Sequence, residues 1–271
     1  MKRNLSRTGG VAAVAAAALL AGTALVADGT RFSEFTPLTA SAGPTLDESL
    51  PITLGNPLFE QRSIADRAAQ LAASIPNSGS WDMNTVNETG RQRGRFLFTV
   101  FETGQAGVQR HDLKTGRTET LWNSLVPFGH VAFDASFWTP WGTFVTAEES
   151  WCTAAAPGCT SNPYGRLFEL ENPLAATGIT EPLTSFSNAG AQFHHRNVVP
   201  RTSHEGIQWD EDGNMYFIDE LNGGSIFKYT PKAKFRHVKL GFADYFAAGQ
   251  TFVLRVGDGS TPNATGGTRP P

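Results

Sequence analysis

Acidic side chains collect where predicted strands end. In chain order they are Glu148, Glu149, Glu205, Asp219 and Glu220. Neighbouring residues on a strand point to opposite faces, so one member of each adjacent pair can face inward. An unpaired buried carboxylate is costly, and Ca²⁺ is a hard cation that takes several oxygen ligands. We therefore expect these acids to form a calcium site, with solvated strand ends or salt bridges as the alternative for each pair.

A second set of polar residues lies in "QFHHRNV", where two histidines precede Arg196. Adjacent histidines on a strand point opposite ways, so they do not form a chelating pair. His194 and Arg196 are candidates for binding phosphate or another small-molecule ligand, because arginine donates two parallel hydrogen bonds to such groups. An exposed loop is the alternative interpretation.

Other sites can be set aside on sequence grounds. The stretch "WDEDGN" contains Asp212-Gly213 between two strand patterns, which predicts a hairpin turn. The spaced downstream ligands of an EF-hand do not follow it. The chain has no G-x-S-x-G, no glycine-rich phosphate loop before a helix and no nucleic-acid signature. The formal net charge of −3 gives no argument for a nucleic-acid partner either.

Two cysteines, Cys152 and Cys159, lie in the short stretch "WCTAAAPGCT". In an exported protein this spacing predicts a disulfide, and the intervening Pro157 and Gly158 help the loop turn. Metal ligation by the pair is the alternative, although two thiols without a nearby histidine make a poor zinc site.

The elements that carry these residues follow a loose repeat. The strand "GRFLFTVFE" precedes a hairpin around Lys114-Thr115-Gly116, "WGTFVTAEE" precedes "GRLFELENP", and "HEGIQWDEDGNMYFIDE" precedes "GSIFKYTP". The stretch "GQTFVLRVGDG" opens a further round. Short antiparallel strands in such units predict an all-β, β-propeller-like fold that is incomplete, with about three blades and a partial fourth. A two-sheet sandwich is the alternative. An open arc leaves strand edges unpaired, which predicts self-association.

The N-terminus has the layout of a secretory signal. Lys2, Arg3 and Arg7 precede an alanine-rich run over 9–27. This layout predicts cleavage near Ala27 and a secreted or periplasmic protein without a stable membrane span. An uncleaved anchor is the alternative, although the run is at the short end of the roughly 20 residues that a span needs.

Four segments follow from these patterns. They are a signal peptide over 1–27, an N-terminal extension over 28–80, a partial propeller over 81–258 and a turn-rich tail over 259–271. The extension contains one helix candidate, "SIADRAAQLAAS". We expect Ser63 to cap this helix and Ile64, Ala68 and Leu71 to share its apolar face.

At "TPWGTFVTAEES" and "SHEGIQWDEDGNMYFIDE" the sequence resembles the PhoX family of secreted bacterial alkaline phosphatases and its uncharacterised relatives. The likeness covers roughly residues 95–258. It implies a β-propeller whose central site holds iron and calcium ions and hydrolyses phosphate monoesters. By this resemblance Glu148, Glu149 and Glu205 match metal-site positions, and Asp219 or Glu220 is a further candidate.

The sequence also departs from that family. Ala147 stands where the family's motif has an iron-ligating cysteine, the twin-arginine export signal is missing, and the later blades do not occur in these 271 residues. We therefore expect calcium rather than iron. Two functions stay open: a metal-dependent phosphate monoester hydrolase acting on a phosphate ester, and a non-catalytic, calcium-stabilised propeller fragment or binding module.

Overall fold

The computed structural model describes residues 51–52, 60–124, 131–150, 164–175, 193–221, 224–233 and 245–255. The chain divides into two units, Met1–Arg62 and Ser63–Pro271. In the first unit the Gln61 side chain exchanges two hydrogen bonds with the Ile52 backbone, of 3.1 Å and 3.0 Å. All the elements described below belong to the second unit.

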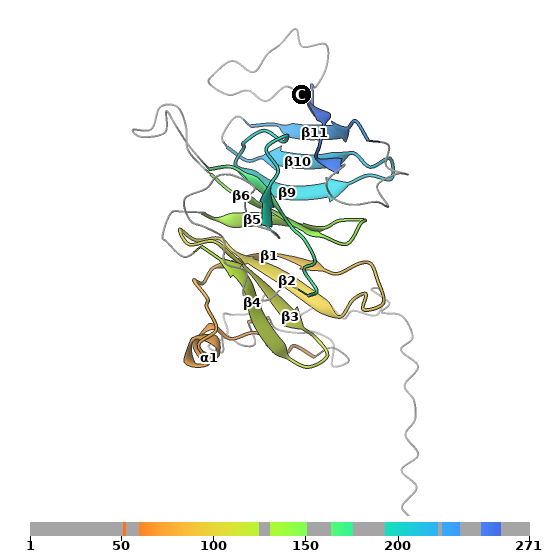
Figure 1. The fold of residues 1–271 in the computed structure, drawn as a ribbon. Helices are drawn as coiled ribbons and strands as arrows, with labels where there is room; N and C mark the ends of the chain where they lie inside the picture. Colours follow the sequence, from red (N-terminus) through yellow and green to blue (C-terminus); the bar gives the residue numbers. More distant parts are fainter. Residues whose placement is uncertain are drawn as a thin grey trace, which may run out of the picture. The chain divides into compact units, whose positions relative to one another are not determined.

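The second unit contains three antiparallel sheets of four strands each, which confirms the all-β prediction (Figure 1). In each sheet the strands follow one another in chain order. The first sheet consists of β1 (Trp81–Val86), β2 (Phe96–Phe101), β3 (Gly107–Asp112) and β4 (Arg117–Asn123). The second consists of β5 (Phe133–Trp138), β6 (Phe144–Glu148), β7 (Leu167–Leu170) and β8 (Phe193–His195). The third consists of β9 (His204–Trp209), β10 (Met215–Asp219), β11 (Ile226–Pro231) and β12 (Gly249–Val253).

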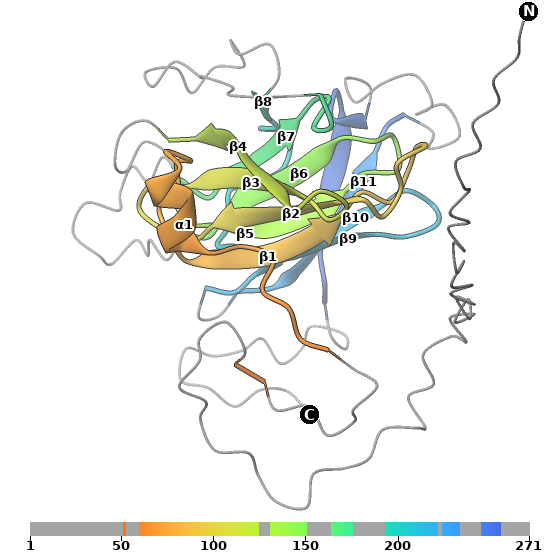
Figure 2. The same ribbon diagram turned by 90° about the horizontal axis from the view of Figure 1, so that it is seen from below.

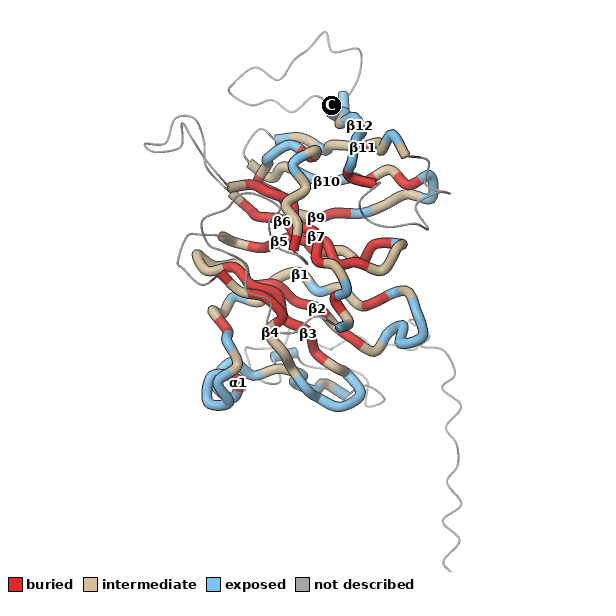
Figure 3. The backbone as a smooth tube through the Cα atoms, in the orientation of Figure 1, coloured by how far each residue is buried: buried red, intermediate tan, exposed pale blue. Residues whose placement is uncertain are grey.

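The sheets lie in layers, and the second sheet is between the other two (Figure 1). One apolar core joins the first and second sheets and includes the stacked rings of Phe98 and Phe144, whose centroids are 5.2 Å apart. A second core joins the second and third sheets and includes Val145, Met215 and Phe217. Figure 3 shows the buried backbone concentrated where the layers face one another.

The first strands of the sheets lie next to one another. β1 contacts β5, and β5 contacts β9. The hydroxyl groups of Thr85 on β1 and Ser136 on β5 lie 2.8 Å apart and share a hydrogen bond. Figure 2 shows β1, β5 and β9 gathered along one side of the sheets. Residues at matching positions of these three strands therefore come close together.

The hairpins follow the predicted turn chemistry. β3 and β4 pair across the turn at Gly116, whose φ is 72°, and β9 and β10 pair across the turn at Gly213, whose φ is 82°. Glycine adopts this left-handed conformation without the steric cost that a Cβ imposes. Both predicted hairpins are confirmed.

Two sequence predictions about elements are wrong. Residues 249–253 do not open a fourth unit, because β12 pairs with β11 and completes the third sheet. The exposed-loop interpretation of His194 and His195 is also wrong, because both residues belong to β8, which pairs with β7. In both cases the strands were recognised or suspected from composition, but their partners are set by long-range pairing, which local pattern does not encode.

The helix prediction is also corrected in its details. Helix α1 covers Arg67–Ala72, and its N-cap is Asp66, not Ser63. Leu71 is 46% exposed, whereas Gln70 is 5% exposed. Gln70 is buried because its side-chain oxygen accepts a 2.7 Å hydrogen bond from Gln109 on β3. The helix thus covers a polar face of the first sheet, and the expected apolar face is not used for packing.

Candidate cation site

Each sheet places two acidic residues at the same two positions. One is the second residue of the sheet's first strand, and the other directly follows the sheet's second strand. In sheet order the pairs are Asp82 with Glu102, Asp134 with Glu149, and Glu205 with Glu220. We call these six residues the acid cluster. Because β1, β5 and β9 are neighbours, the repeat brings acids that are far apart in sequence to one place.

A β-bulge accompanies the acid on each first strand. The pairing register shifts between Trp81 and Asn84 on β1 and between Phe133 and Ala135 on β5. On β9 it shifts between the partners of Phe217 and Asp219, which are Ile207 and His204. A bulge adds an unpaired residue, bends the strand and re-aims a side chain. The same irregularity at three equivalent positions shows that the acids are positioned by a repeated local structure.

A repeated backbone hydrogen bond fixes the second acid of each pair. In every sheet the acid's N–H donates to the carbonyl of the residue just before the first strand. The three bonds are Glu102 to Ser80 at 2.8 Å, Glu149 to Ala132 at 2.7 Å, and Glu220 to Ser203 at 3.0 Å. This bond ties the end of the second strand to the start of the first, so both acids of a sheet lie at the same end.

The acids of the cluster perturb one another. Burial and the neighbouring carboxylate of Asp82 raise the pKa of Asp134 to about 8. Burial and interactions with Glu220 and Glu102 raise the pKa of Glu149 to about 9. Burial and Glu220 also raise the pKa of Glu205. At neutral pH the cluster therefore holds protons that an ordinary carboxylate would have released.

The histidine next to Glu205 in sequence, His204, carries no positive charge that could balance the acids of the cluster. His204 directly precedes Glu205 and is fully buried, with its ring against Phe217 at 5.3 Å between centroids. Burial lowers the pKa of His204 to about 3, so its imidazole is neutral at pH 7. The effects that raise the pKa values of Asp134 and Glu149 are burial and other acids.

Glu148 occupies a different environment from its neighbour Glu149. Its carboxylate is fully buried and accepts hydrogen bonds from Arg166 Nε at 2.8 Å and Arg166 Nη2 at 2.5 Å. The backbone N–H groups of Arg166 and Val131 also donate to it, at 3.0 Å and 3.2 Å. These four bonds make Glu148 part of a structural ion pair, and the structure does not bring it together with the acid cluster.

Asp219 is likewise used to hold the backbone. Its Oδ1 accepts from the N–H groups of Ser203 at 3.0 Å and Leu221 at 3.2 Å. Of the five acids expected to bind metal, the structure therefore brings together Glu149, Glu205 and Glu220.

The two residues expected to bind a substrate are each paired with an acid. Arg196 donates to the fully buried Glu169 through Nε at 2.8 Å, and its Nη2 lies 2.8 Å from the same carboxylate. His194 Nε2 lies 2.5 Å from Glu171. Arg196 thus contacts Glu169 on β7, and His194 contacts Glu171, which directly follows β7.

Sequence reasoning missed Asp82, Glu102 and Asp134. Glu102 ends the stretch "GRFLFTVFE" and matches the acids that end the two later second strands. That match was a usable signal. Asp82 and Asp134 lie early in strands that were not recognised from the sequence, so nothing marked them as members of the repeat.

The donor set fits a hard cation. All six residues offer carboxylate oxygens, which calcium prefers, and Ala147, one residue before the end of β6, offers no thiolate. Among the described residues, no group of three or more His, Cys, Asp or Glu side chains is arranged as a ready metal-ligand set. The carboxyl groups instead hydrogen-bond to one another in a row: Glu149 interacts with Glu220 and Glu102, Glu205 with Glu220 and Asp134, and Asp134 with Asp82. A cation would have to displace the protons that these acids share.

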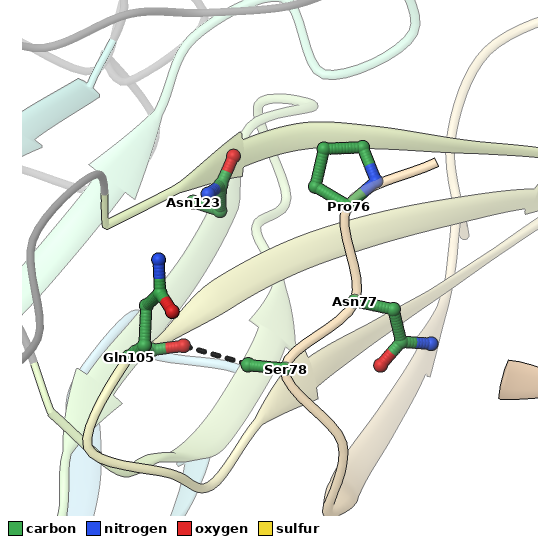
Figure 4. A pocket seen from close by; sticks show the side chains of 5 residues that line it. All are labelled: Pro76, Asn77, Ser78, Gln105 and Asn123. Atoms are coloured by element: carbon green, nitrogen blue, oxygen red, sulfur yellow. Dashed lines mark hydrogen bonds between the residues drawn. The ribbon is translucent and has the colours of Figure 1, made fainter. Parts of the chain in front are cut away.

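A pocket of about 230 Å³ lies elsewhere on the first sheet and is lined by Pro76, Asn77, Ser78, Gln105 and Asn123 (Figure 4). The Ser78 hydroxyl donates a 2.7 Å hydrogen bond to the Gln105 carbonyl across it. The lining contains amide and hydroxyl groups but no acid. None of the six residues of the acid cluster lines this pocket.

Several predicted features lie outside the described residues: the signal peptide over 1–27, the tail over 259–271, and the pair Cys152 and Cys159. Within the described part of the chain, no helix is both long and apolar enough to cross a membrane. No family model matches this chain, and no curated protein matches it.

Proposed function

We propose that this protein is an exported, calcium-binding module with a partial β-propeller architecture related to the PhoX-type phosphatases. The architecture is supported by three successive four-stranded meanders whose first strands are neighbours. In a propeller the first strand of each blade lines the central axis. On this proposal each sheet is a blade, and the acid cluster lies around the axis.

The observation that carries the proposal is the threefold repeat of the acid pair. A carboxylate that is buried among other carboxylates destabilises the fold unless a proton or a cation compensates it. The pKa values of about 8 for Asp134 and about 9 for Glu149 indicate how strongly compensation is required. Calcium supplies two positive charges and accepts a flexible set of six to eight oxygen ligands.

A binding module is favoured over a phosphatase by the positions of the remaining residues. Phosphoryl transfer needs positive groups around the phosphate as well as metal ions. Arg196 and His194 are instead paired with Glu169 and Glu171. Ala147 lacks the thiolate that the resemblance associates with iron. We propose that calcium stabilises the fold and that hydrolysis of phosphate monoesters is weak or absent.

Calcium titration of the chelator-treated chain, followed by calorimetry and by thermal unfolding, tests this proposal. At about 100 times its dissociation constant, a bound ion raises the free energy of unfolding by roughly 2.7 kcal/mol. Magnesium should stabilise the protein less, because it requires a small, regular octahedral site. Hydrolysis of a chromogenic phosphate monoester is measured on the same samples with calcium or iron. Robust iron-dependent turnover would show that the protein is an enzyme.

A further inference from the structure

The first sheet ends in two neighbouring turns that concentrate positive charge. One turn joins β1 to β2 over 87–95, with the sequence NETGRQRGR, and the other joins β3 to β4 over 113–116, with the sequence LKTG. Residues 90–94 and 113–117 are exposed (Figure 3). The Leu113 N–H donates a 2.9 Å hydrogen bond to the Arg95 carbonyl, which holds the two turns side by side. We call residues 87–95 and 113–117 together the basic tip.

The cations of the basic tip outnumber the acids that could balance them. They are Arg91, Arg93, Arg95, Lys114 and Arg117. Arg95 donates to Asp112 through Nε at 2.9 Å and Nη2 at 2.5 Å, and Arg117 donates to Glu119 at 2.8 Å. Among the described residues, no acid forms an ion pair with the other three cations. The tip itself contains one acid, Glu88. Three exposed cations are therefore free to contact an anionic partner.

This positive charge is local, because the whole chain has a formal net charge of −3. The basic tip lies at the opposite end of the first sheet from its two cluster acids. β1 begins beside Asp82 and ends at the tip, whereas β2 begins at the tip and ends just before Glu102. An anionic surface attracts the tip and repels the acid cluster. Charge alone therefore orients the molecule with the tip toward such a surface.

An apolar side chain lies among these cations. Leu113 directly precedes Lys114, and its side chain is 46% exposed. An anionic bilayer offers phosphate groups for the cations and hydrocarbon for the leucine. Single-stranded nucleic acid offers phosphate groups too, but its proteins stack the bases on aromatic side chains, and the tip has no aromatic residue. The composition of the tip thus favours a lipid surface over nucleic acid.

We propose that the basic tip docks this protein on an anionic phospholipid surface. Arg91 and Arg93 donate hydrogen bonds to the headgroup phosphates, because a guanidinium matches two phosphate oxygens at once. Lys114 adds a third positive charge, and Leu113 inserts at the boundary between headgroups and acyl chains. The contact is peripheral and crosses no part of the bilayer. In this orientation the acid cluster faces away from the lipid.

Co-sedimentation of the full chain with lipid vesicles tests the proposal. Vesicles of phosphatidylcholine are compared with vesicles that also contain phosphatidylglycerol, in chelator, because calcium bridges carboxylates to lipid phosphates. We expect binding to the anionic vesicles only, and added salt should weaken it. Arg93→Glu should weaken it by about tenfold or more, since each basic residue at an anionic surface contributes about fivefold. Arg255→Glu is the matched control, because it changes the net charge equally but lies after β12, where Leu254 N–H donates to the Ile226 carbonyl at the end of the sheet away from the turns.

Leu113→Ser separates a bilayer from a soluble polyanion. It should weaken binding to anionic vesicles by about threefold or more, because an inserted leucine leaves water, and it should not alter binding to a single-stranded oligonucleotide. Three results would overturn the proposal: no binding to anionic vesicles at low salt, equal effects of Arg93→Glu and Arg255→Glu, or tight oligonucleotide binding with no effect of Leu113→Ser on vesicles. Because chelator is present throughout, failure of lipid binding leaves the cation proposal untouched, and failure of calcium binding leaves the lipid proposal untouched.

Discussion

Glu148 and Glu149 are adjacent in sequence but have opposite surroundings. Strand alternation sends one side chain to Arg166 and the other to the acid cluster. A carboxylate that holds a guanidinium through two hydrogen bonds is satisfied and serves the fold. A carboxylate among acids remains available to a cation. At the level of single residues, the role of each acid therefore depends on the side chains that it contacts, not on its position in the sequence.

Replacing Glu149 by glutamine should separate binding from folding. We expect Glu149→Gln to weaken calcium binding by about tenfold or more, because a charge-bearing ligand is lost. Without calcium the variant should be as stable as the parent or more stable, since like-charge repulsion is reduced. Calorimetry and chemical denaturation measure the two effects. Glu88→Gln is the control, because Glu88 is exposed in the β1–β2 turn. Equal loss of affinity in both variants would argue against a local site.

The Arg166–Glu148 pair makes a different prediction. Arg166→Met should lower the free energy of unfolding by about 3–5 kcal/mol, because it leaves the fully buried Glu148 carboxylate without its cation. The double variant with Glu148→Gln should recover part of this loss. Urea denaturation gives both values. A single variant within about 0.5 kcal/mol of the parent would mean that water reaches the carboxylate and replaces the arginine.

At the scale of elements, the acids are positioned by strand ends and bulges. The first strand of each sheet bulges at its acid, and the second strand ends just before its acid. Turn chemistry and apolar strand composition predicted β2, β3, β4, β6, β7, β9, β10, β11 and β12 from the sequence. Bulges and the contacts between β1, β5 and β9 depend on packing between sheets, so the convergence of Asp82 and Asp134 could not be predicted from either strand alone.

Gly165, which precedes β7, offers a test at this scale. Its φ is 74°, and a Cβ there would lie 2.6 Å from the Thr202 carbonyl oxygen. Gly165→Ala should therefore destabilise the protein by more than about 1 kcal/mol. Gly94→Ala is the control, because Gly94 has a similar φ of 76° but no atom within 4 Å of the added Cβ. Equal losses of stability in thermal denaturation would mean that the close contact at Thr202 is relieved.

At the scale of the whole molecule, the sequence predicted an all-β chain with three strand units and the start of a fourth. The assignment of the fourth unit was wrong. Residues 249–253 read as a new strand unit, yet they complete the third sheet. Composition identifies a strand, whereas the strand with which it pairs depends on which sheet edge is free. The same limit applies to α1, where hydrogen bonds to the first sheet bury Gln70 in place of the apolar residues that periodicity favoured.

The acid cluster also predicts how the whole fold responds to pH. A carboxyl whose pKa is higher in the folded state binds more protons there than in the unfolded chain, so stability falls as pH rises through that range. For Asp134 and Glu149 the range runs from their unfolded values near 4 to about 8 and about 9. The melting temperature in chelator should decrease between pH 7 and pH 9, above the range in which the buried His204 and His111, whose pKa values are lowered to about 3 and about 4, gain stability as pH rises. Saturating calcium should reduce the decrease. A flat or rising profile in chelator would contradict this account.

The most direct test is diffraction from crystals grown with calcium, using the anomalous signal to locate the ion. We predict an anomalous peak within the acid cluster, with oxygen atoms of Asp134, Glu149 and Glu205 at the 2.3–2.6 Å that calcium requires. Crystals of the Glu149→Gln variant should show a weaker peak or none. A calcium-saturated crystal whose six acids remain paired with one another, with no peak among them, would contradict the central claim that this repeat is a cation site.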